Sequence, residues 1–198
     1  MKGYNKLRKK ALEILHSKLP KDLSYHSIDH TLNVLKACND YIKREKIASH
    51  SAKLLRLAAL MHDIGFTISN KDHEETSKDM AVDLMKAHGF PKKDIDIVKG
   101  LILATRIPQF PKNELEKIIC DCDLDYLGRS DFYIISNQLF RELEFSPMTK
   151  TELAWNKFQI KFMEAHNYHT KFALKNRQPN KETRIAELKE LVGKLEYQ

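Results

Sequence analysis

Three short segments of the sequence carry histidines and aspartates whose types and spacing suit a bound cation. SYHSIDHT (residues 24–31) places His26 and His30 four residues apart, so both project from one face if the segment is helical. ALMHDIGF (residues 59–66) holds His62 and Asp63 in an apolar stretch, and CDCDLDYLG (residues 120–128) holds Asp123. Nitrogen and oxygen ligands without thiolate suit Mn, Mg, Fe, Ni, Co or Zn, with open positions for water and a phosphate.

Each of these features also has an interpretation that needs no metal. A His-x-x-x-His pair is more often on the surface or satisfied in a core, and aspartates at helix starts are usually caps. The order of the set favours a metal: a histidine, a His-Asp pair in an apolar helix, and then Asp123 with isoleucines and leucines on both sides. A carboxylate in such surroundings is costly to bury unless it is paired or binds a cation. We therefore expect one or two divalent ions.

Helices must position these residues, because apolar residues recur with a helical period along most of the chain. There is no convincing alternation of period two and no Asn-Gly or Asp-Gly hairpin turn. The predicted fold is all-α, a compact multi-helix bundle, with a loop at FTISNKD and with Gly128 suited to a left-handed C-cap. The predicted helices cover about 4–19, 27–46, 49–63, 73–88, 92–105, 113–127, 131–144, 149–166 and 181–196.

The composition is that of a globular protein. The 198 residues are 42% hydrophobic and 31% charged, which indicates a single domain over 1–198. No apolar run approaches the roughly 20 residues that span a bilayer, and the N-terminal segment lacks a signal-peptide core, so we expect a cytoplasmic protein. Three cysteines argue against a disulfide framework, and Cys120-x-Cys122 lacks the second pair of a structural zinc site. The net charge of +7 arises from scattered lysines, which favours a solvated surface over nucleic-acid binding.

At the candidate metal ligands the sequence resembles the HD-domain metal-dependent phosphohydrolase superfamily, whose signature is H…HD…D. The matching residues are His30, His62, Asp63 and Asp123. The resemblance covers about 22–128, and about 129–198 would form a C-terminal helical extension. It implies an all-helical fold, a divalent metal held by these four residues, and hydrolysis of phosphate esters.

Two segments also resemble class I cyclic-nucleotide phosphodiesterases. YHSIDHT is similar to their Tyr-His-Asn-x-x-His-Ala segment, and CDLDYLG is similar to their Cys/Ala-Asp-Leu-Ser segment. The second likeness selects Asp123 over Asp121 and Asp125 as the ligand. The first implies that His26 is the histidine that protonates the leaving oxygen.

The sequence lacks motifs that are typical of several subfamilies of this superfamily. These differences argue against those subfamilies but do not identify a substrate. Ser27 stands where those phosphodiesterases have Asn. HDIGF lacks the Glu-Asp pair of guanosine tetraphosphate hydrolases, and no Gly-Tyr-Pro motif of cyclic di-GMP hydrolases follows it. Deoxynucleotide triphosphohydrolases usually have His-Arg where this chain has His-Ser.

Further candidates follow the His-Asp pair. His73 and Glu74 begin a predicted helix and could reach a second metal, orient a water or contact the substrate. The alternative is a helix start in which Asp72 is the N-cap and Glu75 completes a capping box. His88 lies at a helix C-terminus, where a structural role is favoured over a second-metal ligand.

Basic residues later in the chain could contact a phosphate. Arg106, at the end of a predicted helix, could bind a substrate phosphate or simply complement the helix dipole. The segment AHNYHTKFALKNRQP (residues 165–179) could fold over the site, although a solvated surface helix is favoured.

Together these features predict a hydrolase for a phosphomonoester or phosphodiester, with a nucleotide, including a cyclic nucleotide, as the expected substrate. His26 and Asp63 would be catalytic, with Asp63 also a ligand. The alternative is a non-catalytic nucleotide-binding or signalling module built on the same pocket. The expected partner is a small phosphorylated molecule rather than nucleic acid or a membrane, and a homodimer is one candidate assembly.

Overall fold

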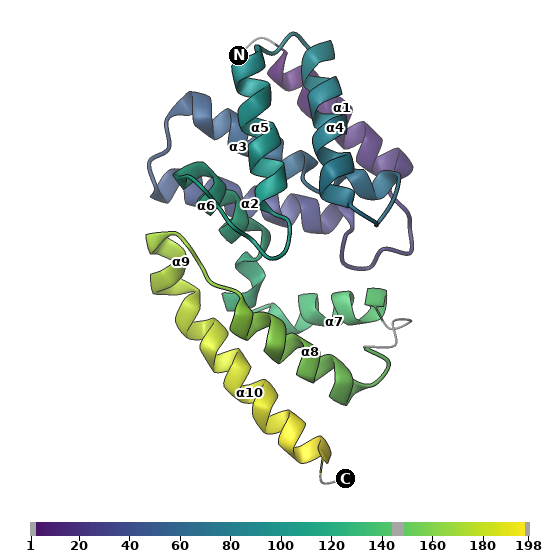
Figure 1. The fold of residues 1–198 in the computed structure, drawn as a ribbon, viewed down its shortest axis with the longest axis vertical. Helices are drawn as coiled ribbons and strands as arrows, with labels where there is room; N and C mark the ends of the chain where they lie inside the picture. The colour runs from purple at the N-terminus through teal and green to yellow at the C-terminus, as the bar shows by residue number, and fades with distance from the viewer. Residues whose placement is uncertain (1–2, 144–148, 197–198) are drawn as a thin grey trace. The chain divides into compact units, whose positions relative to one another are not determined.

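The computed structural model describes residues 3–143 and 149–196, and these form helices joined by short connections (Figure 1). The described residues contain no strand, so the all-α prediction is confirmed. Contacts between Cα atoms divide the chain into two compact units, Met1–Asp123 and Leu124–Gln198. That the chain forms one domain stays a prediction. No described helix is both long and apolar enough to span a membrane.

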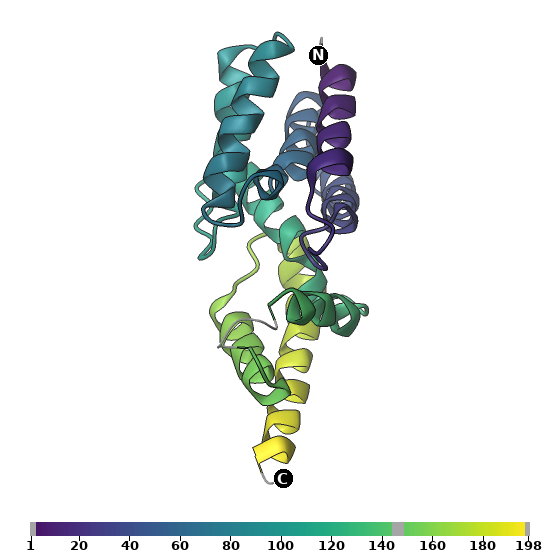
Figure 2. The ribbon, with the colours of Figure 1, turned by 90° about the vertical axis from the view of Figure 1, so that its right-hand side faces the viewer.

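Over its described residues, 3–123, the first unit holds six α-helices and one 3₁₀ helix. α3 is its centre: eight of its residues are buried, and it contacts α1, α2, α5 and α6. In both views α4 and α5 lie side by side, and they also make extensive contacts (Figures 1 and 2). The elements are α1 (Tyr4–Lys18), α2 (Ile28–Arg44), α3 (Ser49–Met61), η1 (Ile64–Thr67), α4 (His73–Ala87), α5 (Lys92–Ala104) and α6 (Glu114–Asp123).

Local chemistry explains where α2 begins. Ser27 has extended backbone angles, and its hydroxyl accepts a hydrogen bond from the His30 backbone N–H at 3.5 Å. Asp29 in the first turn and Lys43 and Arg44 in the last turn complement the helix dipole. His30 therefore lies in the first turn of a helix whose start is defined by its own sequence.

A close backbone approach holds η1 against the start of α4. A Cβ atom on Gly65 would lie 2.2 Å from the His73 carbonyl oxygen and 2.9 Å from the Ser77 backbone nitrogen. The Gly65 N–H donates to the Ser77 hydroxyl at 2.8 Å. Only glycine permits this approach, which places the N-terminus of α4 next to the His62–Asp63 pair.

The second unit contains η2 (Asp125–Gly128), α7 (Phe132–Leu143), α8 (Glu152–Ala165), α9 (Lys171–Asn176) and α10 (Gln178–Glu196). α10 contacts α8, α9 and η2. The buried Asp125 carboxylate accepts a hydrogen bond from Arg177 Nε at 2.7 Å, which ties η2 to the start of α10. Lys181 is buried and donates to the carbonyls of Met163 and His166 at the end of α8.

Several predicted boundaries were wrong. The sixth helix ends at Asp123 rather than about 127, and a 3₁₀ turn follows. The last helix begins at Gln178, and α9 was not predicted. Gly128 is not a left-handed C-cap, because the described glycines with positive φ are Gly3 and Gly89. A Cβ atom on Gly128 would lie 2.4 Å from the Arg177 carbonyl oxygen, so close packing explains this glycine.

Candidate metal centre

Four of the predicted ligands converge at one point of the first unit. His30 comes from the first turn of α2, His62 and Asp63 directly follow α3, and Asp123 ends α6. The Nε2 atoms of His30 and His62 lie 3.3 Å apart. Asp63 Oδ2 lies 3.3 Å from His30 Nε2 and 3.2 Å from His62 Nε2, and Asp123 Oδ1 lies 3.4 and 3.3 Å from the same two atoms.

These spacings fit a shared cation. Nitrogen and oxygen atoms about 2.1 Å from one ion lie about 3.0–3.4 Å apart around an octahedron or tetrahedron. Ligand atoms of His30, His62 and Asp123 all lie within 4.8 Å of one another, and Asp63 adjoins both histidines. The group is therefore a candidate site for a divalent metal.

The tautomer of His62 supports the same interpretation. Its Nδ1 lies 2.9 Å from the Ala59 carbonyl oxygen, which can only accept a hydrogen bond. Nδ1 therefore carries a proton, and whenever Nε2 is unprotonated its lone pair faces the centre. A lone pair aimed at a second imidazole nitrogen and two carboxylates is the donor set that a cation requires.

Burial and the carboxylates act against each other on the two histidines. Burial lowers the pKa of His30 and His62, but hydrogen bonds and charges from Asp63 and Asp123 outweigh it, so the pKa of His30 is raised and that of His62 well above its ordinary value. Burial raises the pKa of Asp123, yet hydrogen bonds from His30 and His62 lower it to about 2. Burial also raises the pKa of Asp63, but the charge of His62 and hydrogen bonds from His30 and His62 hold it well below its ordinary value. Both carboxylates are therefore ionised near neutral pH, and the centre attracts positive charge.

His26 lies beside this group and not within it. Its ring centroid is 6.0 Å from that of His30. The ring stacks on Phe66 at 4.2 Å and meets Tyr25 edge-on at 4.7 Å. Two aromatic neighbours thus orient a half-buried imidazole at the edge of the centre.

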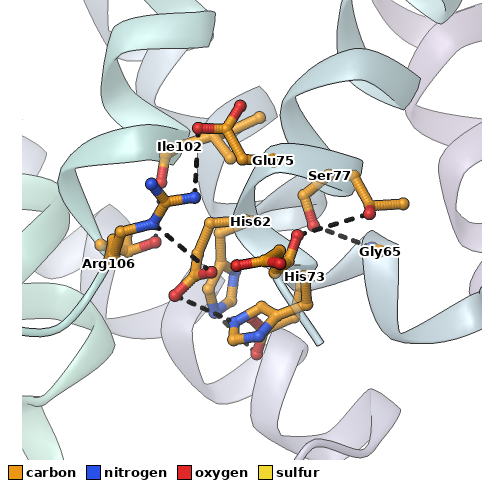
Figure 3. Close-up of polar contacts among 12 residues, drawn as sticks. His62, Gly65, His73, Glu75, Ser77, Ile102 and Arg106 are labelled. Carbon is orange, nitrogen blue, oxygen red and sulfur yellow. Dashed lines mark hydrogen bonds and ion pairs between the residues drawn. The ribbon is translucent and has the colours of Figure 1, made fainter. Parts of the chain in front are cut away.

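His73 approaches Asp63 from the other side of the carboxylate. His73 Nε2 lies 3.5 Å from Asp63 Oδ1, whereas Oδ2 faces His30 and His62. His73 Nε2 also lies 3.5 Å from Glu74 Oε1, and its ring stacks on Phe66 at 4.2 Å. Figure 3 shows His73 near His62, with Gly65 and Ser77 adjoining.

Arg106 joins this network through two carboxylates. Its Nη2 donates to Glu75 Oε1 at 3.1 Å (Figure 3). Its Nε lies 3.8 Å from Glu74 Oε2. The capping box that was the alternative interpretation of this segment is absent: Asp72 has a left-handed backbone, and its side chain makes no cap hydrogen bond. Glu75 is directed to Lys78 and Arg106 instead.

Other candidates lie elsewhere. His88 is 15 residues beyond His73, about 22 Å along α4, and its Nδ1 lies 2.7 Å from the Leu84 carbonyl oxygen. Asp125 is paired with Arg177 in the second unit. That the segment 165–179 covers the metal centre stays a prediction.

Sequence reasoning did not identify the aromatic neighbours of the site. Tyr25 lies 4.6 Å from His30 between ring centroids, and Phe66 lies between His26 and His73 with a stacking distance of 4.2 Å to each. Both residues adjoin the metal-type motifs in the sequence, and this adjacency was the one available signal.

The chain was compared with known families, curated proteins and solved structures. The model of the HD domain family matches residues 27–125, which is half of the chain and includes His30, His62, Asp63 and Asp123. The curated proteins and the solved structures gave no match. The likeness to cyclic-nucleotide phosphodiesterases therefore stays a prediction. By the family match, with its four signature residues at one point, the chain belongs to the HD domain family, which generally comprises metal-dependent hydrolases.

Proposed function

We propose that this protein is a metal-dependent phosphohydrolase that cleaves a phosphomonoester or phosphodiester bond of a nucleotide. The observation that carries the proposal is the convergence of the His30 and His62 nitrogens with the Asp63 and Asp123 carboxylates, all within 3.4 Å of a neighbour. A divalent ion bound there would supply a Lewis acid for a phosphate oxygen and lower the pKa of a bound water.

The residues around the centre have separate roles in this proposal. The Ala59 carbonyl holds His62 in the tautomer that offers Nε2 as a ligand. His26, held against Phe66 and Tyr25, donates a proton from a ring nitrogen to the departing oxygen. Asp63 keeps one oxygen toward the ligand histidines and the other toward His73, so His73 orients the carboxylate.

The geometry favours one ion over two. Among the described residues, His30, His62 and Asp123 form the group of three that could hold a metal, and His73 with Glu74 forms no second such group. We therefore assign His73 to Asp63 as a hydrogen-bond partner. The nucleotide is proposed from the resemblance of YHSIDHT and CDLDYLG to phosphodiesterase segments.

The test is metal analysis followed by a panel of cyclic mononucleotides, mononucleotides, nucleoside triphosphates and dinucleoside polyphosphates with Mn, Mg, Ni and Co. Wild-type protein should release phosphate or open a cyclic ester. Asp63→Asn should lose that activity with its helix content unchanged. Asp96→Asn is the matched control, because Asp96 is exposed on α5 and pairs with Lys92.

Turnover that persists in Asp63→Asn would refute the assignment of the centre. Tight nucleotide binding without turnover at any metal would instead support the alternative, a nucleotide-binding or signalling module.

A further inference from the structure

A pocket lies on the first unit, between α1, α2 and α3, and has a volume of about 320 Å³. Polar side chains line it: Tyr4 and Arg8 from α1, Asn39 from α2, and Lys53 and Arg56 from α3. Its apolar lining includes the buried side chains of Leu57 and Leu60. None of these residues belongs to the metal centre.

The charge of this pocket is entirely positive. Arg8, Lys53 and Arg56 line it, and no carboxylate does. In the ranges that the structure describes, no ion pair connects any of these three to an Asp or Glu, whereas Lys9 and Lys10 on the same α1 lie near Glu13. Three cations placed together without a counter-charge repel one another, and an anion in the pocket would relieve that repulsion.

Hydrogen bonds orient one of the cations. The Asn39 side-chain amide donates to the Leu35 carbonyl at 3.0 Å, which directs its own oxygen to Arg56 Nε at 2.7 Å. This bond uses one edge of the guanidinium, and the terminal N–H groups can still donate to a ligand. A guanidinium held in one orientation matches the paired oxygens of a phosphate.

Tyr4 adds a hydroxyl donor to the same surface. Burial raises the pKa of Tyr4, while the charges of Arg56 and Arg8 act in the opposite direction. The hydroxyl is thus close enough to both guanidiniums to feel their charge, and it stays protonated at neutral pH.

We infer that this pocket is a binding site for a small phosphorylated molecule with at least two negative charges, separate from the metal centre. Arg8, Lys53 and Arg56 would contact the phosphate oxygens, and Leu57 and Leu60 would contact the uncharged part. A pocket lined by three helices suits a small ligand, whereas nucleic acid would need an extended basic stripe.

The helices that line the pocket also position residues of the metal centre. α2 carries His30, and His62 directly follows α3, two residues after Leu60. α1 contacts both α3 and η1, the element that follows Asp63. An anion bound by all three helices would tie α1 to two of the three helices that position the metal ligands.

The experiment is calorimetric titration of the full chain with methylenediphosphonate, whose P–C–P bond cannot be hydrolysed, in buffer without added metal. Wild-type protein should bind about one equivalent. Arg8→Gln/Lys53→Gln removes two of the three charges and should weaken binding by at least about tenfold. Lys9→Gln/Lys36→Gln removes the same charge from exposed positions on α1 and α2 and should bind like wild type.

Wild-type affinity in both double variants would overturn the inference. An equal loss of affinity in both would overturn it too, because the loss would then be an effect of net charge alone. If the pocket variant does not fold, Asn39→Asp provides the second test, since it places a carboxylate beside Arg56. It should also weaken binding about tenfold, and unchanged affinity there would overturn the proposed site.

Discussion

Asp63 Oδ1 lies 3.5 Å from His73 Nε2, while Asp63 Oδ2 lies 3.2 Å from His62 Nε2. One carboxylate therefore joins the ligand histidines to a network that continues through Glu74 to Arg106. The side chain is buried, so its orientation depends on these polar neighbours rather than on water. His73 thus acts on the centre through Asp63.

Replacing His62, a predicted ligand, and replacing His73, a partner of Asp63, should have different effects on metal content. His62→Ala removes a ligand, and we expect the purified protein to lose its metal. His73→Ala removes a partner of Asp63, and we expect it to keep close to one ion per chain with metal affinity lowered about 10- to 100-fold. Elemental analysis and a chelator competition would measure both.

His16→Ala is the control for this pair, because His16 is exposed on α1. Two ions per wild-type chain, with one lost in His73→Ala, would contradict the single-ion assignment.

The effect of replacing His26 on the rate of hydrolysis should depend on the leaving group of the substrate. If it protonates the departing oxygen, His26→Ala should slow hydrolysis of a nucleotide ester by about 10²–10⁴-fold. A p-nitrophenyl phosphate ester, whose leaving group needs little protonation, should lose much less activity. The ratio of kcat/KM for the two substrates measures this, and an equal loss on both would show that His26 acts otherwise.

The metal-type motif could be predicted because each part has a local signal. His30 follows a recognisable helix start, and the His-Asp pair follows an almost entirely apolar helix. The choice of Asp123 over Asp125 had no local basis and came from resemblance. In the structure Asp125 pairs with Arg177, a residue 52 positions away, and no short-range pattern reports such a contact.

Other features were missed because they depend on backbone conformation or distant packing. Asp72 has the sequence of an N-cap, but its φ of 50° directs the side chain away from that role. Arg8, Lys53 and Arg56 read as scattered surface cations, and only the packing of α1 against α3 brings them to one pocket. The packing of η1 against α4 at Gly65 likewise could not be predicted from the sequence.

Gly65 gives a stability prediction with an internal control. Gly65→Ala would place a methyl group 2.2 Å from the His73 backbone oxygen, so the start of α4 must move. We expect a loss of at least about 1–3 kcal/mol in the free energy of unfolding, together with weaker metal binding. Gly193→Ala meets nothing within 4 Å and lies inside α10, so it should stabilise by about 0.5–1 kcal/mol. Urea denaturation of the two variants would test this, and equal effects would contradict it.

The contribution of Lys181 to stability should depend on pH. It is 2% exposed, its amino group donates to the carbonyls of Met163 and His166, and burial lowers its pKa below the ordinary 10.5. Lys181→Met leaves those carbonyls without this donor, and we expect a loss of about 1–3 kcal/mol at neutral pH. Between the lowered pKa and 10.5 the unfolded chain binds more protons than the native one, so wild-type stability rises with pH relative to the methionine variant.

The destabilisation caused by Lys181→Met should therefore grow as the pH is raised from neutral toward 10.5. Urea titrations of both proteins across this range would measure it, and subtraction removes the contribution of groups common to both. Lys189→Met, at an exposed position of α10, is the matched control. A difference between wild type and Lys181→Met that shrinks with rising pH would mean that the folded protein holds the Lys181 proton more tightly than the unfolded chain, so that the pKa of Lys181 is raised rather than lowered.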